Sequence, residues 1–245
     1  MTLYQWPDQA AFGRIVPKHK IYENATVSTA LKDRFVAEVA QIRWAYKLSP
    51  DTTRLPATEN VSEIQVFRIQ QRVPALNHDI LHAIDRAIPS PIFFELIFED
   101  REKYAAAHKR PHAQGGERWV ISDYFEGEWQ PADAARTTLP HALDLEKLYA
   151  QILGELIDRM MINLIGEAIG RSYLPDYNLS MADLIAIDAQ IVGLEAIKKQ
   201  VREIEKLEKR VQREKQFNKR VELNSRLKKV RKNLIQATSR HFNSR

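Results

Sequence analysis

A row of basic side chains near the C-terminal end has the residue types and spacing that best fit a chemical role. The steps within the row are four, four, four and three residues, which places its members on one face of an α-helix. The row consists of Lys198, Arg202, Lys206, Arg210 and Arg213. A second, less regular basic group follows: Lys228, Lys229, Arg231 and Lys232. Cations in a row can neutralise successive phosphates of a nucleic acid and release its counterions. We therefore predict that both groups bind nucleic acid; an acidic protein partner and a solvated helix face remain alternatives.

The distribution of charge supports a polyanionic partner. Residues 195–245 hold 17 Lys and Arg against 6 Asp and Glu, a net charge of +11, whereas residues 1–194 hold 20 against 26, a net charge of −6. The chain has no cysteine, which excludes disulfides, thiolate metal sites and cysteine nucleophiles and fits a cytoplasmic protein. We expect no secretory signal and no membrane contact, because no apolar run approaches the ~20 residues of a span.

Acidic residues on predicted strands suggest a second hypothesis, a metal-dependent nuclease. Such enzymes hold Mg²⁺ with carboxylates and activate water beside a lysine, and Glu95 with Lys109 would be the candidate pair. The acid-x-lysine spacing of restriction-type nucleases is absent, because Leu96 and Ile97 follow Glu95. No phosphate-binding glycine loop or three-histidine zinc set is evident either. We therefore predict no catalytic residue, metal or cofactor, and keep the nuclease as an alternative.

A smaller basic cluster lies near the N-terminus. Lys18 and Lys20 follow Pro17, and Lys109 with Arg110 ends a predicted strand. If the fold brought the two segments together, they would form a secondary basic patch; an exposed turn explains the first pair equally well.

The strands that would position these residues are predicted from apolar and β-branched runs. They cover 12–16, 61–70, 91–98, 103–110 and 118–125. The last three are separated by short polar turns, which favours an antiparallel meander.

Helices are predicted between the first strands. Leu31, Phe35, Val39, Ile42 and Tyr46 recur at helical spacing, so we expect a helix of about five turns that follows Ser28 and stops at Ser49-Pro50. A second helix, capped by Asn77 or Asp79, carries Ile80, Leu81, Ile84 and Ile88 on one side, and Pro89 follows it. Residues 1–130 should form an α+β domain, with a small mixed or antiparallel sheet and helices on one face.

The remaining chain is predicted to be helical. Residues 131–180 are predicted to form a linker and a helical segment, and residues 181–240 are predicted to form a long basic coiled-coil helix. Its heptad-like seam consists of Leu194, Ile197, Val201, Ile204, Leu223, Leu227, Val230 and Leu234. The seam fails between Val211 and Val221, where either a stutter or a hairpin would fit. We favour one helix because no turn residues occur in that stretch.

Several segments together resemble one bacterial family. They are PKHKIYE, LPAT, IPSPIFFEL, AAHKRP, YFEGEWQPADA, LPHALDLEKLY and, most specifically, REKQFNKRVELNSRLKKVRKNL. The chain resembles, over nearly its whole length, the family catalogued as domain of unknown function 4391. The resemblance implies an accessory subunit of a restriction-like or phage-defence system that works beside a helicase-like translocase or a DNA methyltransferase. It supplies no catalytic residues.

Taken together, these observations favour a non-enzymatic accessory subunit that docks on such a partner and contacts DNA through its basic helix. A metal-dependent nuclease subunit and a homo-oligomeric coiled-coil scaffold are the alternatives.

Overall fold

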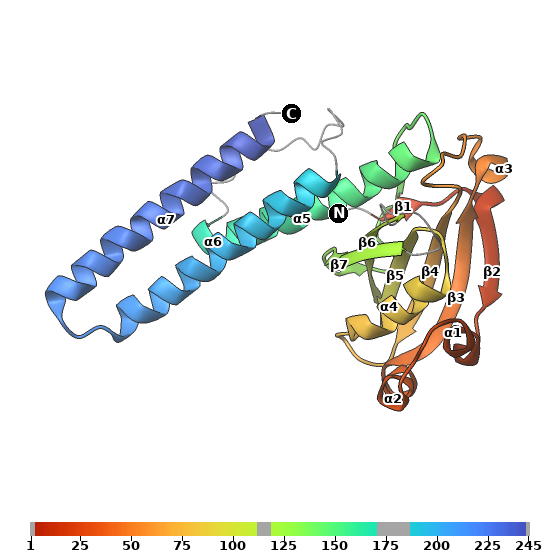
Figure 1. The fold of residues 1–245 in the computed structure, drawn as a ribbon, viewed down its shortest axis with the longest axis horizontal. Coiled ribbons are helices and arrows are strands. Elements are labelled where there is room, and N and C mark those ends of the chain that lie inside the picture. The colour runs from red at the N-terminus through yellow and green to blue at the C-terminus, as the bar shows by residue number, and fades with distance from the viewer. Residues whose placement is uncertain (1–2, 112–118, 171–186, 244–245) are drawn as a thin grey trace. The chain divides into compact units, whose positions relative to one another are not determined.

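The computed structural model describes residues 3–111, 119–170 and 187–243, with side chains up to Thr238 (Figure 1). The chain divides into two compact units, Met1–Leu156 and Ile157–Arg245. Within the described ranges, no helix is both long enough and apolar enough to cross a membrane.

The first unit is built around a mixed sheet. Its strands are β1 (Tyr4–Gln5), β2 (Ala11–Ile15), β3 (Val39–Leu48), β4 (Ile64–Gln71), β5 (Ile92–Phe98), β6 (Arg101–Pro111), β7 (Trp119–Glu126), β8 (Gln130–Pro131) and β9 (Thr137–Thr138). Its helices are the 3₁₀-helix η1 (Asp8–Ala10), α1 (Lys18–Asn24), α2 (Thr29–Glu38), α3 (Pro50–Thr53), α4 (His78–Ala87) and the first half of α5 (Leu145–Ile169).

The main sheet has the order β2-β3-β4-β5-β6-β7, and β8 pairs with β6. Neighbouring strands are antiparallel except for β4 and β5, which run parallel. A parallel pair needs a crossover, and α4 provides it. β1 and β9 form a separate parallel pair.

Helices cover both faces of the sheet. On one face α1, α2 and α4 bury Ile21, Phe35 and Ile80 against apolar side chains of the central strands. On the opposite face, the α5 residue Tyr149 packs on Phe93 of β5, with ring centroids 5.6 Å apart. The expectation of helices on one face was therefore incomplete.

The predicted helix over 31–46 is wrong in its second half. Helix α2 ends at Glu38, and Val39–Leu48 is the strand β3 between β2 and β4. The burial pattern explains the error: β-bulges between Val39 and Gln41 and between Trp44 and Tyr46 shift the register, so every third residue of the strand is buried. A buried residue at every third position imitates one face of a helix.

Other expectations about this unit are confirmed. The 91–125 meander corresponds to β5, β6 and β7. Ser28 caps α2 by accepting from the Leu31 N–H at 3.2 Å, and Asn77 caps α4 by accepting from the Asp79 N–H at 2.8 Å. Part of the expected turn between the strands 103–110 and 118–125, and the end of the expected linker and helical segment over 131–180, lie outside the described residues.

The second unit contains the end of α5, then α6 (Ile187–Arg213) and α7 (Phe217–Asn243). The prediction of one continuous C-terminal helix is wrong, because the chain leaves the helix at residues 214–216 and α7 packs back along α6 (Figure 1). The two helices form a hairpin of antiparallel helices, which we call the basic hairpin.

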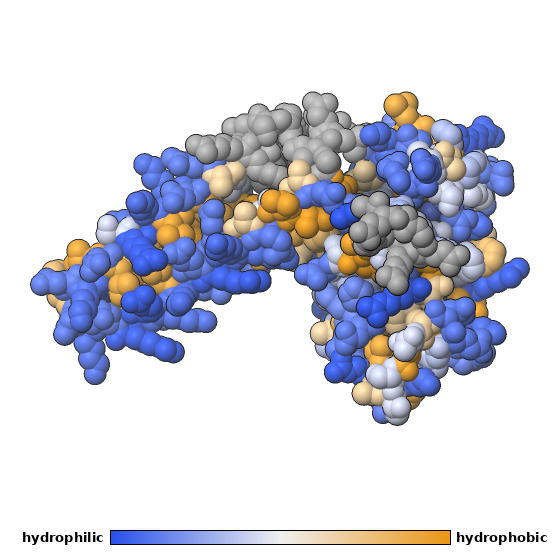
Figure 2. Space-filling view, in the orientation of Figure 1, coloured by the Kyte–Doolittle hydropathy of each residue, from blue (hydrophilic) through white to orange (hydrophobic). Residues whose placement is uncertain are grey.

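The predicted seam lies largely inside this hairpin. Leu194, Ile197, Val201, Ile204, Leu227 and Leu234 are buried, whereas Leu223 and Val230 are half-buried. Leu207, which the sequence pattern did not include, is also buried. Hydrophilic residues cover most of the hairpin face shown in Figure 2. One chain thus buries most of its own seam.

Candidate functional site

Glu95, one of the two residues of the nuclease hypothesis, is completely buried in a cluster of hydrogen bonds. Its carboxylate accepts from the Trp6 indole N–H at 2.8 Å, from Arg136 at 3.2 Å and from Arg68. The Tyr104 hydroxyl lies 3.4 Å away. Arg136 also binds the carboxylate of Glu102, so two arginines share two carboxylates, and the Trp6 contact ties the N-terminal segment to the sheet.

Lys109, the other residue of that hypothesis, lies in a different buried cluster. Its ammonium donates to the carbonyls of Asp85 and Ile88 at the end of α4 and lies 3.5 Å from the Asp85 carboxylate. The Tyr124 hydroxyl donates to the same carboxylate. Burial raises the pKa of Asp85 to about 6, although Lys109 and Tyr124 act in the opposite direction. Burial likewise lowers the pKa of Lys109.

The two clusters lie on opposite faces of the sheet. Phe94 and Leu96, the neighbours of Glu95, face the core that α4 covers, so Glu95 faces the other way. Lys109 contacts α4 itself and therefore lies on the α4 face. The structure does not bring the candidate pair together, and no group of three or more His, Asp or Glu in the described ranges could hold a metal ion. The geometry thus gives the nuclease hypothesis no site.

The predicted secondary basic patch is not formed as expected. Lys109 is only 2% exposed, which removes it from any surface. Lys18 donates to the Val39 carbonyl at 2.6 Å, and Lys20 pairs with Glu23 at 2.8 Å. Arg110, although exposed, has a partner of its own. Lys18 and Lys109 therefore bind backbone carbonyls of neighbouring elements, and Lys20 is paired within α1.

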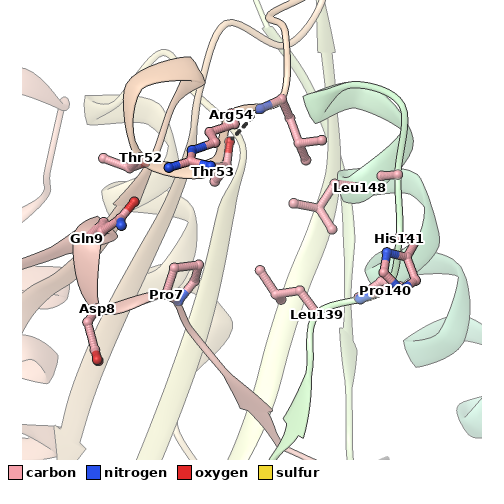
Figure 3. A pocket seen from close by; sticks show the side chains of 12 residues that line it. Pro7, Asp8, Gln9, Thr52, Thr53, Arg54, Leu139, Pro140, His141 and Leu148 are labelled. Atoms are coloured by element: carbon pink, nitrogen blue, oxygen red, sulfur yellow. Dashed lines mark hydrogen bonds between the residues drawn. The ribbon is translucent and has the colours of Figure 1, made fainter.

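A cavity of about 500 Å³ lies in the first unit, between residues 7–9, 52–55 and 139–142. Figure 3 shows Leu139 and Leu148 in its middle, with His141 and Arg54 on opposite sides. The hydroxyl of Thr53 is engaged, because it donates to the Ser49 carbonyl and accepts from the Leu55 N–H. Among the described residues, no hydrogen bond joins Arg54 to His141. The cavity is large enough for a small molecule, and Asp8 and His141 are among the residues that line it.

The basic hairpin presents most of its cations to solvent. A groove of about 330 Å³ on α6 is lined by five cations and one acid: Arg202, Glu205, Lys206, Lys209, Arg210 and Arg213. The structure thus brings four of the five predicted row residues together. It adds Lys209, whose position three residues after Lys206 was a signal that the sequence analysis left unused.

Only some hairpin cations are paired with acids. Arg226 contacts Glu203 at 3.0 Å across the two helices, and Arg231 contacts Glu208 in the same manner. Lys198 pairs with Glu195 at 2.7 Å on α6. The remaining predicted cations have no ion pair within the described part of the chain: Arg202, Lys206, Arg210, Arg213, Lys228, Lys229 and Lys232.

The fold and these sites define a class of protein: a mixed α+β unit joined to a basic helical hairpin, in which the described residues show no catalytic constellation. The chain belongs to the family described as Domain of unknown function (DUF4391), whose model matches residues 5–234. No curated protein and no solved structure matches the chain.

Proposed function

We propose that this chain is a non-enzymatic accessory subunit that binds nucleic acid through the phosphate backbone, along the α6 groove of the basic hairpin. One observation carries the proposal: Arg202, Lys206, Arg210 and Arg213 line a shared groove and have no acidic partner within the described residues. Grouping unpaired cations costs electrostatic free energy, and a polyanion recovers it.

Burial of the seam within one chain supports nucleic-acid binding rather than a role as a purely homo-oligomeric scaffold. Ile204 is 1% exposed and Leu234 is fully buried within a single chain. A second copy is therefore not needed to cover them, and it would bring two basic surfaces close together. The cations are left available to a ligand of opposite charge.

The length of the groove fits several phosphates. From Arg202 to Arg213 the helix rises about 16 Å at 1.5 Å per residue. Arginine and lysine recognise phosphate through charge and N–H donors without reading bases. The proposal therefore predicts binding that is independent of sequence and weakens steeply with salt.

The family resemblance alone suggests in which cellular assembly the protein works. We place the protein in the cytoplasm, in a bacterial DNA-acting defence assembly, where the first unit docks on a helicase-like or methyltransferase partner. Affinity purification of the full chain from its native host tests this part. Recovery of neither kind of partner would count against it.

The nucleic-acid part is tested by charge reversal on the groove. The triple variant Lys206→Glu, Arg210→Glu, Arg213→Glu is compared with wild type by fluorescence anisotropy on a labelled 30-nucleotide strand and a 30-base-pair duplex, over a series of KCl concentrations. We expect binding at low salt to fall at least tenfold. We also expect the slope of log K against log[KCl] to become shallower, by about 0.7 to 0.9 for each phosphate that the variant no longer neutralises.

A matched control separates the groove from net charge. Lys20→Glu, Lys32→Glu, Arg54→Glu changes the same number of exposed cations in the first unit. It should leave the affinity within about twofold of wild type. Equal losses in both variants, or wild-type binding by the groove variant, would refute the proposal.

A further inference from the structure

We infer that the turn of the basic hairpin stacks on an unpaired base, so that its ligand is a single strand or a strand junction rather than a closed duplex. This inference rests on the proposed function and specifies the ligand of the same hairpin. The main observation behind it is one exposed aromatic side chain, that of Phe217.

Phe217 is the first residue of α7 and is 69% exposed. It is the aromatic member of the exposed large hydrophobic residues in the described chain. Val221, one helical turn later, is 53% exposed, and residues four apart lie on the same helix face. The two side chains form a small apolar patch at the turn that neither α6 nor α7 covers.

Backbone hydrogen bonds fix the turn that presents this patch. The Glu214 N–H donates to the Arg210 carbonyl at 3.0 Å, which completes α6. The Gln216 N–H donates to the Glu214 carboxylate at 2.8 Å, and the Arg220 N–H donates to the Gln216 carbonyl at 3.0 Å, which starts α7. The Glu214 carboxylate is therefore engaged in shaping the turn, and the exposed Phe217 begins α7 directly after it.

Cations outnumber acids around the patch, where the exposed Glu222 follows Val221. Lys215, Lys219 and Arg220 are exposed and have no ion pair within the described residues, and the α6 groove ends at Arg213, four residues before Phe217. The amino end of α7 adds a partial positive charge at the same place. The basic hairpin of a second copy would meet this surface with like charge, which disfavours pairing of two hairpins at the turn.

An apolar ring between cations fits one ligand chemistry well. A nucleic-acid strand alternates flat apolar bases with phosphates, so a base can stack on Phe217 while phosphates on either side meet Arg213 and Lys219. Stacking of this kind tolerates every base, because each has a π face. In a closed duplex those faces are already stacked on each other, so only an unpaired base is available to Phe217.

The test uses the full chain as wild type, Phe217→Ala and Phe217→Trp. Its probes are a labelled 30-nucleotide oligo(dT) strand and a labelled, relaxed, covalently closed duplex circle, which has neither ends nor single-stranded loops. We expect Phe217→Ala to lose about 5- to 100-fold in affinity for the strand and to stay within about twofold for the duplex circle. Phe217→Trp should retain strand binding and show additional quenching of tryptophan fluorescence relative to wild type. Val192→Ala shortens an exposed apolar side chain that lies on α6. This variant should bind both probes with the affinity of wild type.

The outcomes separate this inference from the proposed function. If groove charge reversal abolishes binding while Phe217→Ala binds both probes as wild type does, the base-stacking inference fails and the proposed function stands. If Phe217→Ala weakens both probes equally, selective stacking is likewise refuted. If wild type binds neither probe, both fail. Concentration-dependent dimerisation in light scattering that Phe217→Ala removes would assign the patch to self-association and overturn the inference.

Discussion

The buried carboxyl of Asp85 leads to a pH dependence of stability opposite to that of most acidic side chains. It is 2% exposed, and burial raises its pKa from 3.8 to about 6. A carboxyl that binds its proton more tightly in the folded state contributes stability that is fully present below pH 3.8. That contribution is lost as the pH rises through about 6. The change in pKa corresponds to about 3 kcal/mol.

The variant Asp85→Asn isolates this contribution, because asparagine does not titrate and can still accept the Tyr124 hydrogen bond. The free energy of unfolding of wild type minus that of the variant should fall by about 3 kcal/mol between pH 3 and pH 7. Groups that do not interact with residue 85 cancel in the difference, whereas Lys109, whose pKa the Asp85 carboxylate raises, loses that interaction in the variant.

Urea unfolding followed by tryptophan fluorescence measures this difference. All four tryptophans lie within residues 1–156, so the signal reports the first unit alone. Asp79→Asn is the control on the same helix, because that carboxylate is 64% exposed and pairs with Arg34 at the surface. A difference that stays flat over this pH range for Asp85→Asn would show that burial of the carboxyl does not raise its pKa.

Two substitutions probe the other buried contacts. Leu234→Ala should lower the free energy of unfolding of the second unit by about 2–5 kcal/mol, which is measured as a lower melting temperature in helical circular dichroism. As the control, Val192→Ala changes an exposed side chain and should cost less than about 0.5 kcal/mol. Equal effects of the two variants would mean that the hairpin does not pack as described. Glu95→Gln should destabilise the first unit by roughly 3 kcal/mol in urea, because Arg68 loses its carboxylate partner and Arg136 keeps only Glu102. Wild-type stability of this variant would show that the cluster is not coupled to folding.

The sequence predicted those elements whose signals are local. The runs that became β4, β5 and β7 are continuous and rich in apolar or β-branched residues, and Ser28 and Asn77 are caps that act within three residues of themselves. Each of these signals depends on a few neighbouring side chains and not on contacts with distant parts of the chain.

Strand β3 was missed because its pattern depends on its neighbours. Bulges opposite β4 convert the alternation of a strand into a three-residue repeat, which local analysis assigns to a helix. Strand pairing decides between the two interpretations, and that pairing joins segments far apart in the chain.

Some features of the candidate site could likewise be predicted from local sequence, whereas others depend on strand pairing. The sequence determined that residues 198–213 carry a cationic helix face, because charge and helical spacing are local properties. It could not place Glu95 and Lys109 on opposite faces of one sheet, which follows from the register of β5 and β6.

By itself, then, the sequence determined the acidic first part, the basic end, the family and most of the individual helices and strands. Only the tertiary structure decided that the C-terminal helix folds back at residues 214–216 and closes most of its own seam, leaving Phe217 and the α6 cations exposed. The physical reason is that apolar spacing shows which side chains need burial, whereas the surface that buries them is chosen by long-range packing.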